Sequence, residues 1–378
     1  MKILSLAQID MSQSDGRVTH LLDLAKAFRQ NNVTTDVIVI SSKPSVIQEE
    51  HLKIYVLPKI LTFWLIEGII CNLLAWFIIT LKAKHYDRIY IRHHSNLALA
   101  LKFAFTKKLL WIEVNGLFKD ENIFRAKTIG WRFKNFMGIF LEKLSFKKAN
   151  HIFCVTSQLK EKIINNYSIR AENISFVSNG VDLIKYCPMD KNKCRKQLGL
   201  NNDYIYIGFI GSFIGWAGID TFLNILPKVM LKHEKMQAII VGNGENFEEY
   251  NRLAENLGIK SKVIFPGQVH SNIAPIWINT FDIGVAFIKP KGHGLSPIKL
   301  YSYMACGIPI VASNLEGFEP VKEYNAGILV QKNIEIQNAL EKLITEENLR
   351  IEMGQNGRRC AEKLFSWEIT AKKIISTN

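Results

Sequence analysis

The sequence predicts an α/β protein with two domains, each built around a parallel β-sheet. The chain has 378 residues, of which 48% are hydrophobic, and this length suits two cores of about 150 to 200 residues better than one. A β-rich run at residues 2–6 precedes a loop containing Gly16, a helical pattern and a second β-rich run at residues 37–40. A strand, a glycine turn and a helix follow one another again from residue 204. Such βαβ units place the loop after the first strand at the carboxyl edge of the sheet, where open α/β folds bind ligands.

The six cysteines are scattered, without a CxxC pair or a Cys/His cluster at zinc-binding spacing. We therefore expect reduced thiols. The chain runs from Met1 directly into the first β-rich segment, without the charged and apolar regions of a secretory signal. These features favour a cytoplasmic protein.

The positive charge is concentrated in the first half of the chain. The formal net charge is +14, and residues 1–170 carry 25 Lys and Arg against 13 Asp and Glu, a net charge of +12. A basic half joined to a nearly neutral half indicates a polyanionic partner, either anionic lipid or nucleic acid. No helix-turn-helix, RRM or zinc-finger pattern accompanies the charge, so nucleic acid is disfavoured.

Residues 61–81 form the most apolar window and are long enough to cross a bilayer. Glu67 and Asn72 lie within this window, and β-rich runs flank it at residues 54–57 and 88–92. A single crossing would place two strands of one sheet in different compartments. We therefore expect a buried or membrane-lying helix there.

Aromatic and basic residues alternate along residues 123–148. Apolar residues at helical spacing, including Phe136 and Phe140, predict a stripe that faces the core. Trp131, Arg132 and Lys134 suit a membrane interface, where amphipathic aromatic and basic side chains are favoured. The alternative is a core helix with a solvated basic face.

The stretch at residues 289–313 predicts a loop, a helix and a buried strand. Ser296 and Pro297 are typical of a helix start and Gly307 of its end. A helix N-terminus favours a phosphate, because free N–H groups and the positive end of the dipole meet there. Lys299 lies in the first turn, where the dipole disfavours a cation unless an anion is nearby. The stretch predicts an anion site, and the alternative is a solvated lysine on an ordinary helix.

Three segments resemble a known family. Residues 296–300, Ser-Pro-Ile-Lys-Leu, and residues 303–309, Tyr-Met-Ala-Cys-Gly-Ile-Pro, are similar to the donor-site helix of the GT-B glycosyltransferases of family 4. Residues 179–182, Asn-Gly-Val-Asp, resemble another signature of this family. The similarity continues along nearly the whole chain, which is identified as a member of the retaining, nucleotide-sugar-dependent group 1 glycosyltransferases.

The resemblance implies the GT-B fold, with two Rossmann-like domains facing each other across a cleft. The expected acceptor-binding domain comprises residues 1–182, and the expected nucleotide-sugar domain comprises residues 183–365. A C-terminal helix at about 366–378 is expected to return to the first domain. The polar run at residues 185–203 is interpreted as the linker and lead-in.

The resemblance also assigns a donor site. The implied donor-binding residues are Gly16, Gly211, Ser212, Gly242, Asn243, Gly244, Val269, Gly294, Leu295, Ser296, Lys299 and Ser302. Among these, Lys299, the helix N-terminus near Ser296 and the turn at Ser212 would stabilise the diphosphate as it departs.

The donor site departs from the family pattern at four positions. Members often carry an Arg and a Lys where this chain has Ser212 and Ala217, and two glutamates where it has Gly294 and Ser302. A carboxylate binds vicinal hydroxyls more strongly than a serine does. The departures leave open whether activity is reduced or abolished.

The acceptor side is expected at the ends of two strands, where Arg92 and Glu113 stand, followed by Asn115. Many members place a histidine at the position of Asn115. An amide can hydrogen-bond a sugar hydroxyl but cannot take its proton. The implied catalytic residues are Lys299, Asn115 and Ser212, and the alternative for Glu113 and Asn115 is capping of strand ends.

The resemblance implies transfer of a hexosyl group from a nucleotide sugar, with retention of configuration and without a metal or other cofactor. Together with the basic first half, it predicts a lipid-linked or other glycan acceptor, an anionic membrane surface as partner, and a peripheral location at the inner face of the plasma membrane during surface polysaccharide synthesis. A nucleotide-sugar epimerase on the same fold, a non-catalytic sugar- or nucleotide-binding relative and a nucleic-acid-binding protein are the alternatives.

Overall fold

The computed structural model describes residues 1–7, 16–41, 53–58, 81, 83–92, 109–121, 129–289 and 296–377. The chain divides into two compact units. Unit 1 comprises residues 1–179, 291–296 and 367–378, and unit 2 comprises residues 180–290 and 297–366. The division after Asn179 falls in the Asn-Gly-Val-Asp segment, close to the expected boundary. The apolar window at residues 61–81 lies almost wholly outside the described residues.

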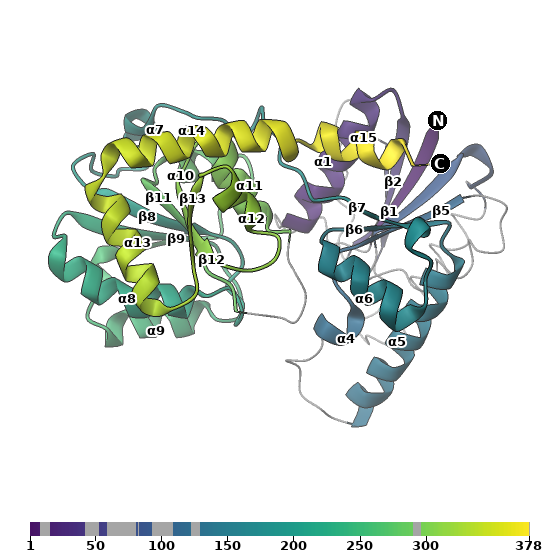
Figure 1. Ribbon diagram of the computed structural model, residues 1–378, viewed down its shortest axis with the longest axis horizontal. Coiled ribbons are helices and arrows are strands. Elements are labelled where there is room, and N and C mark those ends of the chain that lie inside the picture. The colour runs from purple at the N-terminus through teal and green to yellow at the C-terminus, as the bar shows by residue number, and fades with distance from the viewer. Residues whose placement is uncertain are drawn as a thin grey trace. The chain divides into compact units, whose positions relative to one another are not determined.

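Unit 1 is built on a parallel sheet in the order β3-β2-β1-β4-β5-β6-β7, drawn with its helices in Figure 1. The strands are β1 (Lys2–Ala7), β2 (Thr34–Ser41), β3 (Lys53–Pro58), β4 (Arg88–Arg92), β5 (Leu109–Val114), β6 (His151–Cys154) and β7 (Ile174–Phe176). The helices are α1 (Gly16–Gln30), η1 (Ala83–His85), α4 (Phe118–Glu121), α5 (Ile129–Lys148), α6 (Ser157–Tyr167), η2 (Ala171–Asn173) and α15 (Trp367–Ile375).

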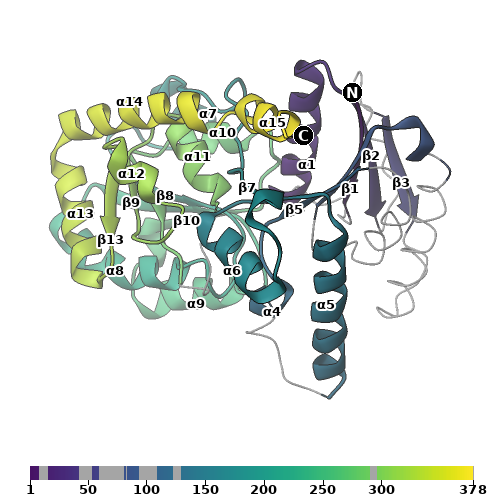
Figure 2. The same cartoon turned by 45° about the vertical axis from the view of Figure 1, so that its right-hand side comes forward.

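The two faces of this sheet are covered by different helices. Ile3 of β1 packs with Phe28 of α1 and Trp367 of α15 in one buried cluster. Its neighbour Leu4 belongs to the cluster on the other face, which includes Phe146 of α5 and Leu159 of α6. Because successive strand residues point to opposite faces, this alternation fixes the register of β1. Figure 2 shows α1 and α15 on one side of the sheet and α5 and α6 on the other.

Unit 2 contains a second parallel sheet, in the order β10-β9-β8-β11-β12-β13. The strands are β8 (Ile205–Ile210), β9 (Met236–Val241), β10 (Val263–Gly267), β11 (Ile283–Ala286), β12 (Ile310–Ser313) and β13 (Gly327–Val330). The helices are α7 (Lys191–Gln197), α8 (Ile219–Lys232), α9 (Phe247–Asn256), η3 (Lys260–Lys262), α10 (Ala274–Asn279), α11 (Ile298–Ala305), α12 (Glu319–Glu323), α13 (Asn333–Thr345) and α14 (Glu347–Leu364). Each sheet thus has the strand order of a Rossmann-like domain, as the sequence predicted.

The segment interpreted as a linker is in part a helix of unit 2. Helix α7 begins after Asp190, whose side chain accepts a hydrogen bond from the backbone N–H of Lys193. Arg195 of α7 is buried and donates to Asp282 over 2.5 Å, and its guanidinium lies 4.8 Å from the ring centroid of Tyr206. This buried pair fastens α7 to the second sheet, so residues 191–197 belong to the domain rather than to a free linker.

Helix α5 presents a different face to the core than the sequence predicted. Phe136 and Phe140, expected inside, are 67% and 48% exposed. The inward face instead contains Gly138, which is packed against the ring of Phe118, and the buried Glu142. Glu142 accepts hydrogen bonds from the backbone N–H of Phe118 over 2.9 Å and from the hydroxyl of Tyr167. These bonds and the small size of Gly138 determine the orientation of the helix, and the prediction from apolar spacing was wrong.

Candidate functional site

The first turn of unit 2 is held tightly against the neighbouring strand end. Gly211 follows β8 with a φ of 151°, and its N–H donates to Val241 O over 3.0 Å. A Cβ on Gly242 would lie 1.9 Å from the carbonyl oxygen of Gly211, so only glycine fits there. Phe213 is fully buried and donates its N–H to Asn243 O over 2.9 Å. The turn between Gly211 and Phe213 is therefore rigid, and Ser212 is its exposed residue.

Lys299 on α11 reaches this turn. Its Nζ lies 4.0 Å from the ring centroid of Phe209, and a Cβ built on Gly211 would be 3.1 Å from it. Tyr303, one helical turn further along, fixes α11 on the sheet, since its hydroxyl accepts from Ile210 N over 2.9 Å and lies 3.3 Å from Val285 O. The N-terminal turn of α11 and the glycine turn after β8 thus come together, as the resemblance implied.

The ammonium of Lys299 has no acidic partner among the residues that the structure describes. Lys299 keeps some exposure as a residue, but burial of its ammonium lowers the pKa to about 7. The ring of Phe209 stabilises a cation only modestly. Burying a charged ammonium costs free energy unless an anion lies close to it. This corner of unit 2 has the chemistry that an anion site needs, and a diphosphate fits that chemistry.

The other predicted donor positions lie in different elements. Gly242, Gly244 and Asn243 form the turn after β9, where Asn243 Oδ1 accepts from Gly244 N over 2.8 Å. Val269 is half-buried just beyond β10. Gly16 is the exposed first residue of α1 in unit 1.

The structure describes three of the four departures from the family pattern, of which Ser212 was placed above. Ser302 is 4% exposed, and its hydroxyl donates to Ile298 O over 3.0 Å within α11. Ala217 is 2% exposed. The serine hydroxyl is thus already engaged, and the methyl group of Ala217 belongs to the core. Gly294 and Leu295 lie outside the described residues, whereas Ser296 is described and accepts from the N–H of Asn179 over 3.0 Å, within unit 1.

The predicted acceptor residues meet at the carboxyl edge of the first sheet. Arg92 and Glu113 are register partners at the ends of β4 and β5. Glu113 is 5% exposed, and one carboxylate oxygen accepts from Asn115 Nδ2 over 2.5 Å and lies 4.0 Å from Arg92 Nε. Glu113 therefore holds its neighbours and does not itself face outward.

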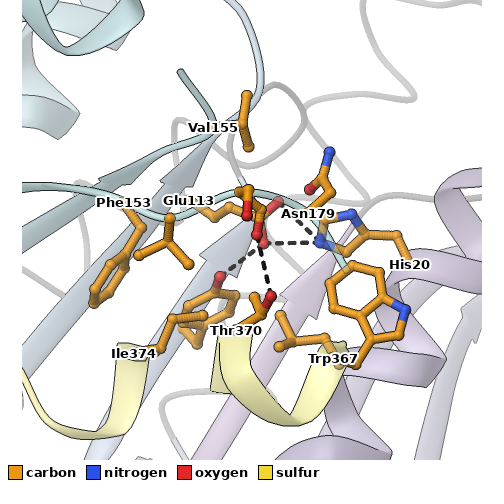
Figure 3. Close-up of a pocket in the computed structure, with 12 residues that line it drawn as sticks. His20, Glu113, Phe153, Val155, Asn179, Trp367, Thr370 and Ile374 are labelled. Carbon is orange, nitrogen blue, oxygen red and sulfur yellow. Dashed lines mark hydrogen bonds and ion pairs between the residues drawn. The ribbon is translucent and has the colours of Figure 1, made fainter. Parts of the chain in front are cut away.

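Two members of this cluster, Tyr90 and His20, were missed by sequence reasoning. The Tyr90 hydroxyl donates to Glu113 over 2.7 Å, and His20 Nε2 lies 3.0 and 3.1 Å from the two carboxylate oxygens. Figure 3 shows His20 from α1, Glu113 from β5 and Trp367 from α15 around a small pocket of unit 1. The only sequence signal for His20 was its place on a helix whose other inward residues are apolar.

The membrane residues Trp131, Arg132 and Lys134 lie on α5, but their side chains are outside the described part of the structure. None of the helices in the described ranges is both long and apolar enough to cross a bilayer. In the same ranges, no three His, Cys, Asp or Glu side chains gather as metal ligands would. The expectation that no metal is used stays a prediction.

Comparison with known proteins gives two family matches, "Glycosyl transferases group 1" over residues 190–360 and "Glycosyltransferase Family 4" over residues 14–185. An uncharacterized glycosyltransferase of Methanocaldococcus jannaschii, MJ1069, is 31% identical over 301 residues, which are 75% of this chain and 71% of that protein. The capsular polysaccharide biosynthesis glycosyltransferase CapM of Staphylococcus aureus is 26% identical over 257 residues, 65% of each protein.

Solved structures share the fold. Anabaena Alr3699/HepE, in complex with UDP-glucose, matches with a TM-score of 0.79 at 20% identity, covering 100% of this chain and 99% of that one. The strand order of both sheets agrees with these matches. The chain belongs to the group 1 glycosyltransferases, enzymes of the two-domain α/β GT-B fold.

Proposed function

We propose that the protein transfers a hexosyl group from a nucleotide sugar to a glycan acceptor, with retention of configuration and without a metal. The observation that carries this proposal is the ammonium of Lys299, which lies beside the turn at Gly211 and has no acidic partner within the described part of the chain. A nucleoside diphosphate bound there would lie beside the ammonium of Lys299 and accept hydrogen bonds from the turn at Ser212. Both interactions strengthen as negative charge develops on the leaving diphosphate, so they favour the transition state.

The donor is expected to be a UDP-sugar or a GDP-sugar. The similarly folded Anabaena protein is solved with UDP-glucose, which supports a nucleotide sugar in general. Ser302 would not supply the strong ribose contact of a carboxylate, because it is buried and bonded within its own helix. Recognition of the nucleotide then depends more on backbone groups of the turns after β9 and β10.

Transfer between purified components tests the proposal. UDP-glucose, UDP-N-acetylglucosamine and GDP-mannose would each be incubated with octyl glucoside, octyl mannoside and octyl galactoside, and products analysed by mass spectrometry and NMR. We expect one donor to give an octyl disaccharide in the anomeric configuration of the donor. An inverted product would refute retention. A folded protein that yields neither transfer nor hydrolysis from any donor would fit a non-catalytic relative instead.

We further propose a lipid-linked acceptor and a location at the inner membrane face, in surface polysaccharide synthesis. The relationship to the capsular glycosyltransferase of Staphylococcus aureus supports the polysaccharide role. Helix α5 supports the membrane contact, since Phe136, Phe140, Lys143 and Lys147 are exposed and follow one another at helical spacing. In Figures 1 and 2 the N-terminal half of α5 extends beyond α4 and α6. Exposed aromatic and basic side chains together favour an anionic lipid surface.

Replacing Phe136 and Phe140 together with serine is expected to weaken binding to vesicles of phosphatidylglycerol and phosphatidylcholine about tenfold or more, because two inserted rings are lost. Vesicle co-sedimentation measures this. Ile351→Ser in α14, which removes another exposed apolar side chain, serves as the control. Equal sedimentation of the double variant and the control would reject α5 as the membrane contact.

A further inference from the structure

We infer that Glu113 is a positioning residue that fixes the amide of Asn115, so that Asn115 Oδ1 accepts the hydrogen bond of the attacking acceptor hydroxyl. This inference rests on the proposed transfer function and identifies how one residue of the acceptor site is oriented. It also explains why a carboxylate that faces inward stands at the ligand-binding edge of the first sheet.

The Glu113 carboxylate is surrounded by donors from several elements. Tyr90 of β4 donates to one oxygen, His20 of α1 reaches both, and Asn115 Nδ2 lies 2.5 Å from the other. Arg92 Nε is 4.0 Å away. The carboxylate therefore cannot rotate toward a ligand without abandoning buried donors, which would cost free energy for each unmade bond.

The carboxylate keeps its negative charge throughout the working pH range. Burial alone would raise the pKa of Glu113, but His20, Arg92 and the Tyr90 hydroxyl together hold it well below its usual range. Burial and the charge of Arg92 lower the pKa of His20, whereas Glu113 raises it. His20 Nε2 is the donor of this contact, because the ionised carboxylate can only accept. The other ring nitrogen, Nδ1, is buried without a hydrogen-bond partner. An ionised carboxylate only accepts hydrogen bonds.

This charge determines which way the Asn115 amide faces. Because Glu113 can only accept, the amide group within 2.5 Å of it must be the NH₂. Asn115 Oδ1 is therefore turned away from the carboxylate, and Asn115 is only half-buried. Oδ1 is left as an acceptor on the open side of the strand end. A sugar hydroxyl that donates its proton to Oδ1 keeps its oxygen lone pairs free, and one of these is needed to attack the donor sugar.

The loop carrying Asn115 is anchored at its far end too. Leu117 is 2% exposed, and Phe118 N donates to the buried Glu142 over 2.9 Å. Lys162 of α6 pairs with Asp120 over 2.8 Å. Residues 115–118 are thus held between two buried carboxylates, Glu113 and Glu142. Such support from neighbouring groups keeps a binding side chain in one geometry.

Glu113→Gln tests the inference, because it keeps the size of the side chain and replaces one of its two acceptor oxygens with an NH₂ donor. The probes are UDP-glucose and octyl glucoside, or the donor and octyl glycoside that the wild type uses fastest in the transfer panel. We expect transfer to fall about 10- to 100-fold, as for other lost supporting contacts, with unchanged donor affinity. In the Asn115→Ala background, Glu113→Gln should cause no further loss, since its effect passes through Asn115.

Thr370→Val is the matched control. Thr370 is 4% exposed, lines the same pocket and donates its hydroxyl proton to Ser178 O over 3.2 Å rather than to Glu113. The inference would be overturned if Glu113→Gln transferred as well as Thr370→Val does. It would also be overturned if the losses of transfer of Glu113→Gln and Asn115→Ala multiplied in the double variant. If Glu113→Gln does not fold, Asn115→Leu is measured instead and is expected to lose transfer while keeping its donor affinity. Full transfer by Asn115→Leu would overturn the inference. Failure of the wild type to use any donor would count against the proposed function itself.

Discussion

Replacing Lys299 with methionine is expected to weaken nucleoside diphosphate binding about 100-fold, the value of a charge-assisted contact to phosphate in an enclosed site. Methionine keeps the length and apolar packing of the side chain over Phe209 and removes only the ammonium. In the wild type, the lysine loses part of its proton on folding because it becomes buried, and this costs free energy. Methionine has no proton to lose, so the same change should raise the free energy of unfolding of unit 2 near neutral pH by about 1 to 3 kcal/mol.

Calorimetric titration with UDP and GDP measures the first effect, and urea unfolding measures the second. Lys232→Met is the matched control, since Lys232 is exposed on α8 in the same unit and pairs with Glu341 over 2.9 Å. Unchanged nucleotide affinity in Lys299→Met would exclude Lys299 from the donor site. A loss of affinity accompanied by a loss of stability would point instead to a damaged fold.

Donor binding is also expected to weaken as the pH rises. The pKa of Lys299 is lowered to about 7 in the empty site by burial. A bound diphosphate favours the ammonium, so binding takes up a proton whenever the lysine starts neutral. UDP-glucose should therefore bind about 20-fold more weakly at about pH 8.5 than at about pH 6.5 if only the protonated lysine binds it.

UDP-glucose suits this experiment because its diphosphate diester does not change charge over that range. Wild type and Lys299→Met would be titrated in parallel, and the variant should show no pH dependence. The same slope in both proteins would place the titrating group elsewhere. Lys299 should also make the free energy of unfolding of the ligand-free wild type rise with pH, from about 7 to the ordinary pKa of lysine. In that range the unfolded state binds more protons at Lys299 than the folded state does.

The sequence predicted the parallel sheets and the helix around Lys299 because both depend on local signals. The helix starts one residue later than predicted, since Pro297 is its N-cap and the Ser296 hydroxyl accepts from Asn179 instead. The anion site at this helix stays a prediction. Gly242 was assigned to the donor site only by resemblance, and that assignment stays a prediction. The structure explains why the residue is a glycine, since the carbonyl oxygen of Gly211 occupies the space of a Cβ.

Contacts between distant residues could not be predicted in this way. His20 and Glu113 are 93 residues apart, and no pattern in either segment indicates the other. The inward face of α5 was wrong because apolar spacing cannot anticipate that Gly138 receives the ring of Phe118 and that Glu142 is buried. Helix α7 had a readable start at Asp190. The polar composition of α7 gave no sign that the helix packs on the second sheet, because the buried partners Arg195 and Asp282 are 87 residues apart in the sequence.

The calorimetric titration of the wild-type protein with UDP and GDP at about pH 6.5, where Lys299 is protonated, tests the central claim most directly. That claim places the donor diphosphate between Lys299 and the turn at Gly211. We predict saturable binding of one nucleotide, with a single site per chain and an affinity that Lys299→Met removes. Folded protein that binds neither nucleotide, or that binds one equally well without Lys299, would contradict it.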